Sequence, residues 1–223
     1  MAYEFEHEFW LKTDGSGSFV VTAPPWVWNA VKNVGDRTSL DATVNEQSVG
    51  AIFQSSAISN LRVRKVTRQG RPYITVAADF SDINALPGTR AFPDLEVALR
   101  REGERLRLAG VWRRPPVEEG RARGDDAGLM AVRFHLPSEI FEHKNAFEGV
   151  ERGNILSWRQ DLHRGLTGSP IDFGATMGST SVLSATLGLF ALAILTGLCV
   201  MGAALYFFAR RGRAEQARST EIF

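Results

Sequence analysis

The feature that most constrains this chain is a long apolar segment near its C-terminal end. The 22 residues from Leu187 to Phe208 are almost wholly apolar, and no charged residue occurs between Phe173 and Ala209. A helix of that length measures about 33 Å, which matches the hydrocarbon core of a bilayer at about 30 Å. The sequence therefore predicts one transmembrane helix, within residues 182–209.

Charges beside this segment predict its orientation. Arg210, Arg211 and Arg213 follow it directly, and basic residues next to a span favour the cytoplasmic side. We therefore expect residues 210–223 to form a short basic cytoplasmic tail.

The opening residues MAYEFEHEF lack the basic and apolar regions of a signal peptide. Two arrangements follow: an exported domain whose native start lies upstream, or a tail-anchored protein whose domain is cytoplasmic. The flanking arginines favour the first.

Residues 1–178 are long enough to form one soluble domain with its own core. Outside the basic tail the chain has 22 basic and 23 acidic residues, so no excess of positive charge favours binding to nucleic acid. The single cysteine, Cys199, falls within the apolar segment, so the domain forms no disulfide. A disulfide-free domain of this size is viable in any compartment, and the redox environment stays open.

Alternating residues predict a β-rich domain that opens on a half-buried strand. Between residues 3 and 13, apolar side chains and His7 occupy one face and three glutamates occupy the other. The same reasoning predicts strands at residues 18–22, 61–68, 73–79, 95–101, 105–112, 129–136, 140–143, 154–159 and 171–177. Short helices are expected at residues 26–34 and 43–55, with Asp41 near the start of the second. The predicted fold class is α+β: an antiparallel β-rich domain with a few short helices, followed by a single C-terminal transmembrane helix.

Two features of the domain are candidates for a partner surface. The first short helix carries two tryptophans, which are expected to pack in the core, with Trp28 as the candidate for an exception that is exposed to a partner. Arg62, Arg64 and Arg68 project to one side of a predicted strand, where they would meet acidic lipid headgroups or an acidic partner. The alternative for these arginines is a solvated edge that discourages aggregation.

No motif in the sequence indicates catalysis. Residues 113–128 are rich in proline, glycine and charge and predict a mobile surface loop. His135 and His143 lack the His-Glu-x-x-His spacing of a zinc site, and Pro137 interrupts the segment between them. The Gly-x-Ser-x-Gly motif and the Walker phosphate loop are both absent. We therefore expect no catalytic residues, no metal site and no cofactor, and a protein that is not an enzyme.

A series of short motifs spans residues 130–210. It consists of the runs FHLPSEI from Phe134 and GNILSW from Gly153, separated by Asn145 and followed by Gly165, Pro170 and the apolar helix. This series resembles the LppM-like domain of bacterial envelope proteins, in which a strand ends in a Leu-Pro or Phe-Pro step, an Asn turn follows, a strand closes on Trp, and one C-terminal helix anchors the protein. The resemblance implies an α+β periplasmic domain without known enzymatic activity, on a single-pass protein of the bacterial inner membrane.

The physical interpretation of these motifs is structural. Pro137 would end a strand, Gly153 would permit a tight turn, and Trp158 would pack on the sheet while its indole nitrogen finds a partner. The functional alternative places Trp158 in a ligand pocket.

The apolar segment has no Asp, Glu, Lys, Arg or His, so its expected roles are anchoring and lateral association. The candidates for helix packing are Gly188, Ala193, Gly197 and Gly202. The alternative is that lipid fills the grooves beside these small residues. The candidates for interfacial anchors are Tyr206, Phe207, Arg210 and Arg211.

These expectations combine into one functional prediction. The chain is a non-catalytic, membrane-anchored accessory or structural subunit that packs against a larger integral membrane complex, such as a respiratory or photosynthetic one, and stabilises it. Its partners would be integral membrane subunits, contacted through the helix and the domain, and the lipid bilayer. The alternative is an envelope binding module that holds a lipid or another amphiphile between sheet and short helices. A hydrophobic pocket open towards the bilayer would favour that alternative.

Overall fold

The computed structural model describes residues 3–32, 34, 44–116, 128–151 and 153–220, without the side chains of residues 182–185 and 207–220. The chain divides into two compact units, Met1–Ser181 and Val182–Phe223. The predicted boundary at residue 178 falls close to this division. Each unit is described by itself.

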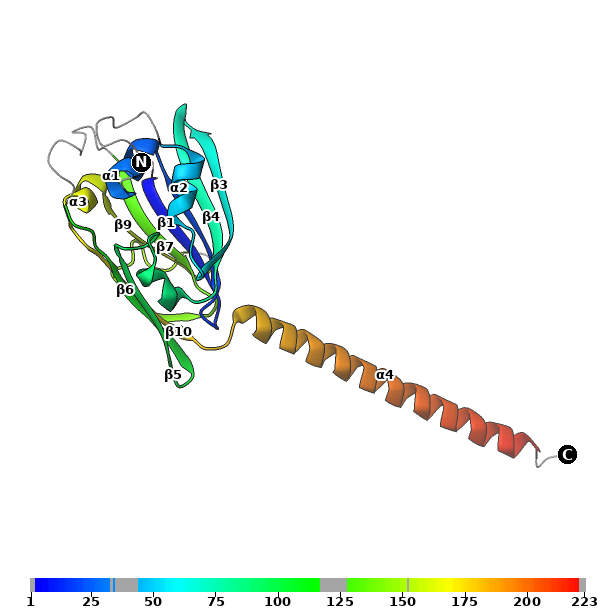
Figure 1. The fold of residues 1–223 in the computed structure, drawn as a ribbon. Helices are drawn as coiled ribbons and strands as arrows, with labels where there is room; N and C mark the ends of the chain where they lie inside the picture. The colour runs from blue at the N-terminus through cyan, green and yellow to red at the C-terminus, as the bar shows by residue number, and fades with distance from the viewer. Residues whose placement is uncertain (1–2, 33, 35–43, 117–127, 152, 221–223) are drawn as a thin grey trace. The chain divides into compact units, whose positions relative to one another are not determined.

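The first unit is built on two β-sheets (Figure 1). The six-stranded sheet has the order β3-β4-β2-β1-β7-β9, and within it β1 and β7 are parallel while the other neighbours are antiparallel. Its strands are β1 (Tyr3–Leu11), β2 (Gly17–Ala23), β3 (Ile58–Arg68), β4 (Arg71–Phe80), β7 (Leu129–His135) and β9 (Ile155–Asp161). The four-stranded sheet is antiparallel, with the order β5-β6-β10-β8. Its strands are β5 (Leu95–Glu102), β6 (Arg105–Trp112), β8 (Ile140–Lys144) and β10 (Ile171–Gly178).

Short helices accompany the sheets. They are α1 (Pro25–Lys32), α2 (Glu46–Ile52), the 3₁₀ helix η1 (Ile83–Gly88) and α3 (Leu162–Leu166). Figure 1 shows α1 and α2 against the six-stranded sheet, at the end of the domain away from the C-terminal end of β10. The second unit is the single long helix α4 (Val182–Thr220), which continues past the predicted end of the span at residue 209.

The alternation of β1 sets the two faces of the six-stranded sheet. Phe5, His7 and Phe9 point into the core and are at most 2% exposed, whereas Glu6 and Glu8 lie on the outer face. The prediction for β1 is therefore confirmed, because side chains of a strand alternate between its faces.

Aromatic rings fill the space between the two sheets. Phe5 meets Trp112 edge to face with 6.0 Å between ring centroids, and Phe134 lies 5.4 Å from Phe173. Phe9 stacks on Phe134 at 4.8 Å. Contacts of this kind stabilise beyond the area that they bury, so the interior is a packed core.

Several predicted boundaries differ from the structure. Helix α1 ends at Lys32 instead of residue 34. Helix α2 covers fewer residues than the predicted 43–55, because Asn45 caps its N-terminus: its side chain accepts from the Ser48 backbone N–H while Ser48 Oγ accepts from the Asn45 N–H. Asp41 and residues 117–127 of the predicted loop lie outside the described residues.

Candidate membrane anchor and partner surfaces

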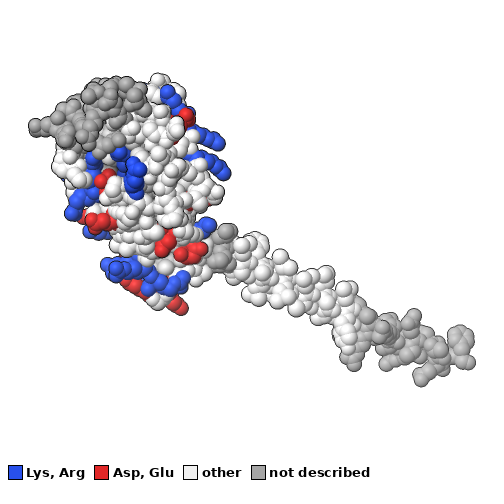
Figure 2. Space-filling view, viewed as in Figure 1, with Lys and Arg blue, Asp and Glu red and all other residues white. Residues whose placement is uncertain are grey.

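Helix α4 contains a segment, Thr186–Tyr206, that is long and apolar enough to cross a membrane, with a mean hydropathy of 2.2. Its large side chains are 55–70% exposed among the residues that the structure describes. Figure 2 shows this segment free of Lys, Arg, Asp and Glu, whereas the domain surface carries many. A helix that is apolar on all sides needs lipid or another protein around it.

The four predicted helix-packing residues do not share one face of α4. At about 100° per residue, Gly188 and Gly202 lie within about 40° of each other, while Ala193 and Gly197 lie about 140° and 180° away from Gly188. Apart from the adjacent residues and the nearby helix backbone, a Cβ added at Gly188, Gly197 or Gly202 would meet no atom of the described residues within 4 Å. Ala193 and Gly197 therefore define one candidate packing face, and Gly188 and Gly202 lie on the opposite one.

Of the predicted interfacial anchors, Tyr206 is 70% exposed at the end of the apolar segment. Phe207, Arg210 and Arg211 belong to α4, and their side chains lie outside the described residues.

The prediction that Trp28 stays exposed for a partner is wrong. Its side chain is fully buried, and its indole N–H donates to the Ile74 carbonyl at 3.0 Å. Phe5 and Phe53 meet its ring edge to face. Helix α1 lays this side chain against β4, which leaves no part of it for a partner.

The predicted row of arginines exists on the edge strand β3. Arg62, Arg64 and Arg68 are exposed and project to one face, because they stand at even spacings along the strand. Arg68 lies above the Tyr73 ring and 3.8 Å from Glu6. Neither Arg62 nor Arg64 forms an ion pair with another residue that the structure describes. The row thus leaves two cations in solvent.

A row of three glutamates runs along β1, which β2 and β4 separate from the arginines of β3. Glu4 is buried and accepts hydrogen bonds from Arg71 and from the Tyr73 hydroxyl, the latter at 2.9 Å. Burial raises the pKa of Glu6, and neighbouring Glu8 adds to this effect while Arg133 and Arg68 oppose it. The outer face is therefore a network of paired charges.

His135, which the sequence places near a second histidine, belongs to that network. It stacks on Trp10 at 4.6 Å, and its Nε2 lies 2.7 Å from Glu8. His143 lies on β8 in the other sheet. Among the residues that the structure describes, no group of three or more His, Cys, Asp or Glu is placed to hold a metal ion.

A cluster of buried polar side chains lies inside the core, and no motif in the sequence predicts it. The Lys32 ammonium lies 3.6 Å from Asp94, with side chains 3% and 9% exposed. His7 is buried nearby, and its Nδ1 has no hydrogen-bond partner among the described residues. Burial lowers the pKa of His7 to about 3, with a further contribution from Lys32. Burial also lowers the pKa of Lys32 to about 8, although Asp94 opposes this shift.

Shifted pKa values mark candidate functional groups, but they also arise in structural ion pairs. The same burial that shifts His7 and Lys32 keeps a substrate away from them, because Phe5, Phe92 and Trp112 surround the imidazole. We therefore interpret the cluster as structural. No spacing of residues in the sequence predicts this cluster, because its three side chains come from α1, β1 and the segment before β5.

The structural interpretation of Trp158 is confirmed. Its ring is buried against Phe134 and Phe173, and its indole N–H donates to the Lys144 carbonyl at 2.6 Å. Gly153 has a φ of +89°, a conformation that suits the predicted turn.

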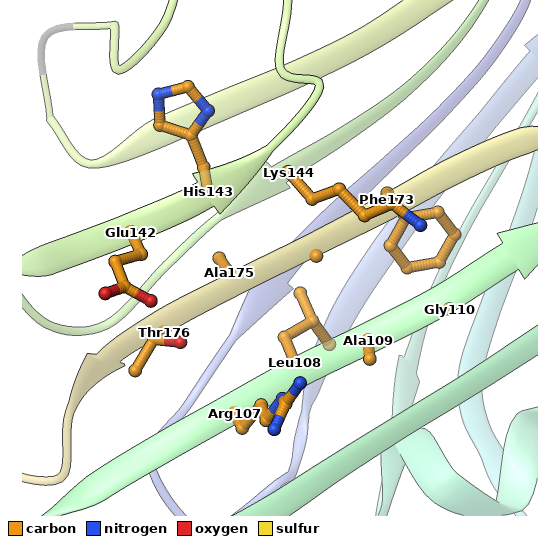
Figure 3. Close-up of a pocket in the computed structure, with 11 residues that line it drawn as sticks. Arg107, Leu108, Ala109, Gly110, Glu142, His143, Lys144, Phe173, Ala175 and Thr176 are labelled. Atoms are coloured by element: carbon orange, nitrogen blue, oxygen red, sulfur yellow. The ribbon is translucent and has the colours of Figure 1, made fainter.

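A groove of about 340 Å³ crosses the outer face of the four-stranded sheet. Figure 3 shows Arg107 of β6 on one side of β10, and Glu142, His143 and Lys144 of β8 on the other. Gly174 and Ala109 form part of its floor. The groove was not predictable from the sequence, because its lining residues come together only when β6, β10 and β8 pair as neighbours.

Within the part of the chain that the structure describes, the class is a two-sheet α+β domain followed by one helix able to cross a membrane. No family model matches the chain, and no curated protein matches it. Among solved structures, the NMR structure of the folded domain of Mycobacterium tuberculosis LppM is similar, with 15% sequence identity and a TM-score of 0.42 over 82% of this chain and 94% of that chain. At this level the similarity does not assign a function.

Proposed function

We propose that the chain is a membrane-anchored, non-catalytic accessory subunit that packs against a larger integral membrane complex. The observation that carries the proposal is α4: its segment Thr186–Tyr206 is apolar on all sides, exposes its large side chains and contains no Asp, Glu, Lys, Arg or His. Such a segment anchors and associates laterally, since it offers nothing for transport.

The Ala193–Gly197 face is the part of α4 that another helix would contact. Two small residues four positions apart let a neighbouring helix backbone approach closely, which supports association by packing. Because Gly188 and Gly202 lie on the other side, the proposal assigns the contact to one face and lipid to the opposite face.

The proposed topology places the domain in the periplasm and residues 210–223 in the cytoplasm of a bacterial inner membrane. Its support is the cluster of arginines after the apolar segment. Protease added to intact inner-membrane vesicles of known sidedness tests it: only inside-out vesicles should protect the domain. Protection in right-side-out vesicles instead would reverse the topology.

The domain gives less support to the alternative of a module that holds an amphiphile between the sheet and the short helices. Trp28 and Phe53 fill that space and are at most 1% exposed, and they are in contact with each other. A lipid chain bound there would have to displace both rings.

Photocrosslinking in intact membranes tests the helix contact directly. Val200 lies about one heptad from Ala193 and so shares its face, whereas Cys199 shares the face of Gly188. A photoreactive residue at position 200 should give one discrete adduct with another membrane protein, and the same residue at position 199 should give lipid adducts only. Equal protein adducts at both positions, or none at either, would contradict the proposal.

A further inference from the structure

The groove on the four-stranded sheet has a floor of small residues. On the outer face, Ala109 of β6 stands beside Gly174 of β10, which stands beside Lys144 of β8. A Cβ at Gly174 would lie 3.3 Å from the Leu108 carbonyl oxygen and 3.7 Å from the Lys144 Cβ. The lack of a side chain at residue 174 therefore keeps the groove open.

The next row of the sheet brings cations together at the rim. Arg107 stands directly opposite Arg100 of β5, and like charges in this position repel each other across the strands. Arg107 lies 3.9 Å from Glu102, but both side chains are more than half exposed, so this pair gives little compensation. Lys144 is in a similar exposed pair with Asp172, at 3.6 Å. An anion bound beside Arg107 would relieve its repulsion with Arg100, and Lys144, across β10, adds a second cation to the groove.

Hydrogen-bonding groups inside the groove complement these cations. Thr176 lies beside Arg107 on one side and beside Glu142 on the other. An arginine and a lysine bind phosphate oxygens, and the Thr176 hydroxyl can donate to them. The Glu142 carboxylate would accept from a hydroxyl of the ligand. The chemistry therefore fits a phosphate ester that also carries hydroxyl groups.

The connection between the groove and helix α4 is short. Gly174 is four residues before the end of β10, about 13 Å along the strand. Only residues 179–181 separate β10 from α4, which spans at most about 14 Å. The Ser179 N–H donates to the Glu104 carbonyl at 3.0 Å, which holds the start of this connection at the β5–β6 turn. At most about 27 Å of chain therefore connects Gly174 with the start of α4, so a bilayer headgroup is among the ligands that the groove can meet.

An exposed aromatic side chain lies at the same end. Phe141 is 48% exposed, and the Arg105 guanidinium lies 5.1 Å from its ring centroid. Glu102, Glu104 and Glu139 also lie here, so the end is not uniformly positive. The attraction is local to the groove and its arginines.

We propose that this groove binds the phosphate headgroup of an anionic phospholipid in the bilayer that holds α4. The proposal rests on the membrane anchoring of the proposed function and is independent of any partner complex.

Chemical modification of lysines in the full chain tests the proposal. The chain is placed in nanodiscs of phosphatidylcholine alone or with phosphatidylglycerol, and a water-soluble amine reagent is added. Mass spectrometry compares Lys144 with Lys65, an exposed lysine of β3 in the other sheet. Phosphatidylglycerol should slow the modification of Lys144 about fivefold and leave Lys65 unchanged. Equal rates in both lipids, or equal protection of both lysines, would overturn the proposal.

Variants separate the groove from general surface charge. Gly174→Val fills the floor and Arg107→Glu reverses the rim charge, so each should abolish the protection of Lys144. Arg64→Glu makes the same charge change on β3 and should preserve it. Protection that survives Gly174→Val, in a chain whose thermal unfolding is unchanged, would contradict a groove-bound headgroup.

Two controls complete the test. One distinguishes a lipid headgroup from a soluble phosphate ester, and the other distinguishes failure of the anchoring proposal from failure of the groove proposal. Glycerol 3-phosphate added to phosphatidylcholine nanodiscs should leave Lys144 reactive, and full protection by it would assign the groove to soluble phosphate esters. Failure of the chain to enter nanodiscs at all would show that the anchoring is wrong. Failure of lipid protection in nanodiscs that contain the chain would refute the groove proposal alone.

Discussion

The domain and helix α4 are both rich in apolar side chains, and they use them in opposite ways. In the domain, Phe9 and Phe134 are fully buried against each other. In α4, Phe190 is 65% exposed and Leu195 is 60% exposed. The domain hides its apolar surface from water within the chain, whereas α4 can hide it only in lipid or against another protein. Stability of the domain and retention in the membrane are therefore separate properties, and separate mutations should change them.

The largest effect is expected in the aromatic core. Phe9→Ala should lower the free energy of unfolding of the domain by about 3–5 kcal/mol, because it removes a stacked ring and leaves a cavity. Phe190→Ala removes the same side chain from α4 and should change domain unfolding by less than about 0.5 kcal/mol. Urea unfolding of both variants in the same detergent provides the measurement. A comparable loss in Phe190→Ala would show that the two regions are one cooperative unit.

The converse experiment places a charge in α4. Leu195→Arg puts a cation near the middle of Thr186–Tyr206, at a cost of about 3 kcal/mol for insertion. The variant should leave the membrane pellet after an alkaline wash, while the domain keeps its unfolding transition. Leu195→Ile serves as the control and should remain in the pellet. Full retention of Leu195→Arg would argue that α4 does not cross the hydrocarbon core.

The buried histidine predicts a pH dependence that belongs to the domain alone. The pKa of His7 is lowered to about 3 in the folded state, so the unfolded chain binds a proton below about pH 6.5 that the folded chain rejects. Stability should therefore fall as pH decreases from about 6.5 to 3, by about 2 kcal/mol at pH 5. His7→Leu should remove this part of the slope in urea unfolding between pH 7 and 4. An unchanged slope in that variant would assign the acid sensitivity to other groups.

The smallest effects are expected on the outer face of the six-stranded sheet. Arg71→Ala leaves the buried Glu4 carboxylate with Tyr73 as its remaining described partner, which should cost about 1–3 kcal/mol. Arg64→Ala removes a solvated cation and should change stability by less than about 0.5 kcal/mol. Thermal unfolding of the two variants makes the comparison. Equal losses would mean that Arg64 is held by contacts like those of Arg71.

Side-chain alternation was enough to predict the strands and one face of β1. The apolar, charge-free run likewise predicted a helix able to cross a membrane, because length and hydropathy are local properties of the sequence. The parallel pairing of β1 with β7 was not predictable in this way, since it joins Glu8 to residues such as His135 that lie far along the chain. The groove between Arg107 and Lys144 depends on such pairings and was missed for the same reason.

Burial of single side chains was harder to predict than element type. A helix of eight residues with two tryptophans does not reveal which of them a sheet will cover, and the acceptor for Trp28 comes from β4. The Lys32–Asp94 pair and His7 come from three separate segments, so no spacing connects them. The arginine row on β3 was predictable because it depends only on alternation within one strand.

The central claim is that the Ala193–Gly197 face of α4 holds the chain in a larger complex. Native mass spectrometry of the full chain after extraction in mild detergent tests it most directly. We expect a species of fixed stoichiometry with other membrane subunits, which Ala193→Leu/Gly197→Leu dissociates and Gly188→Leu/Gly202→Leu preserves. A single species at the mass of one chain, 24.6 kDa, before any substitution would contradict it.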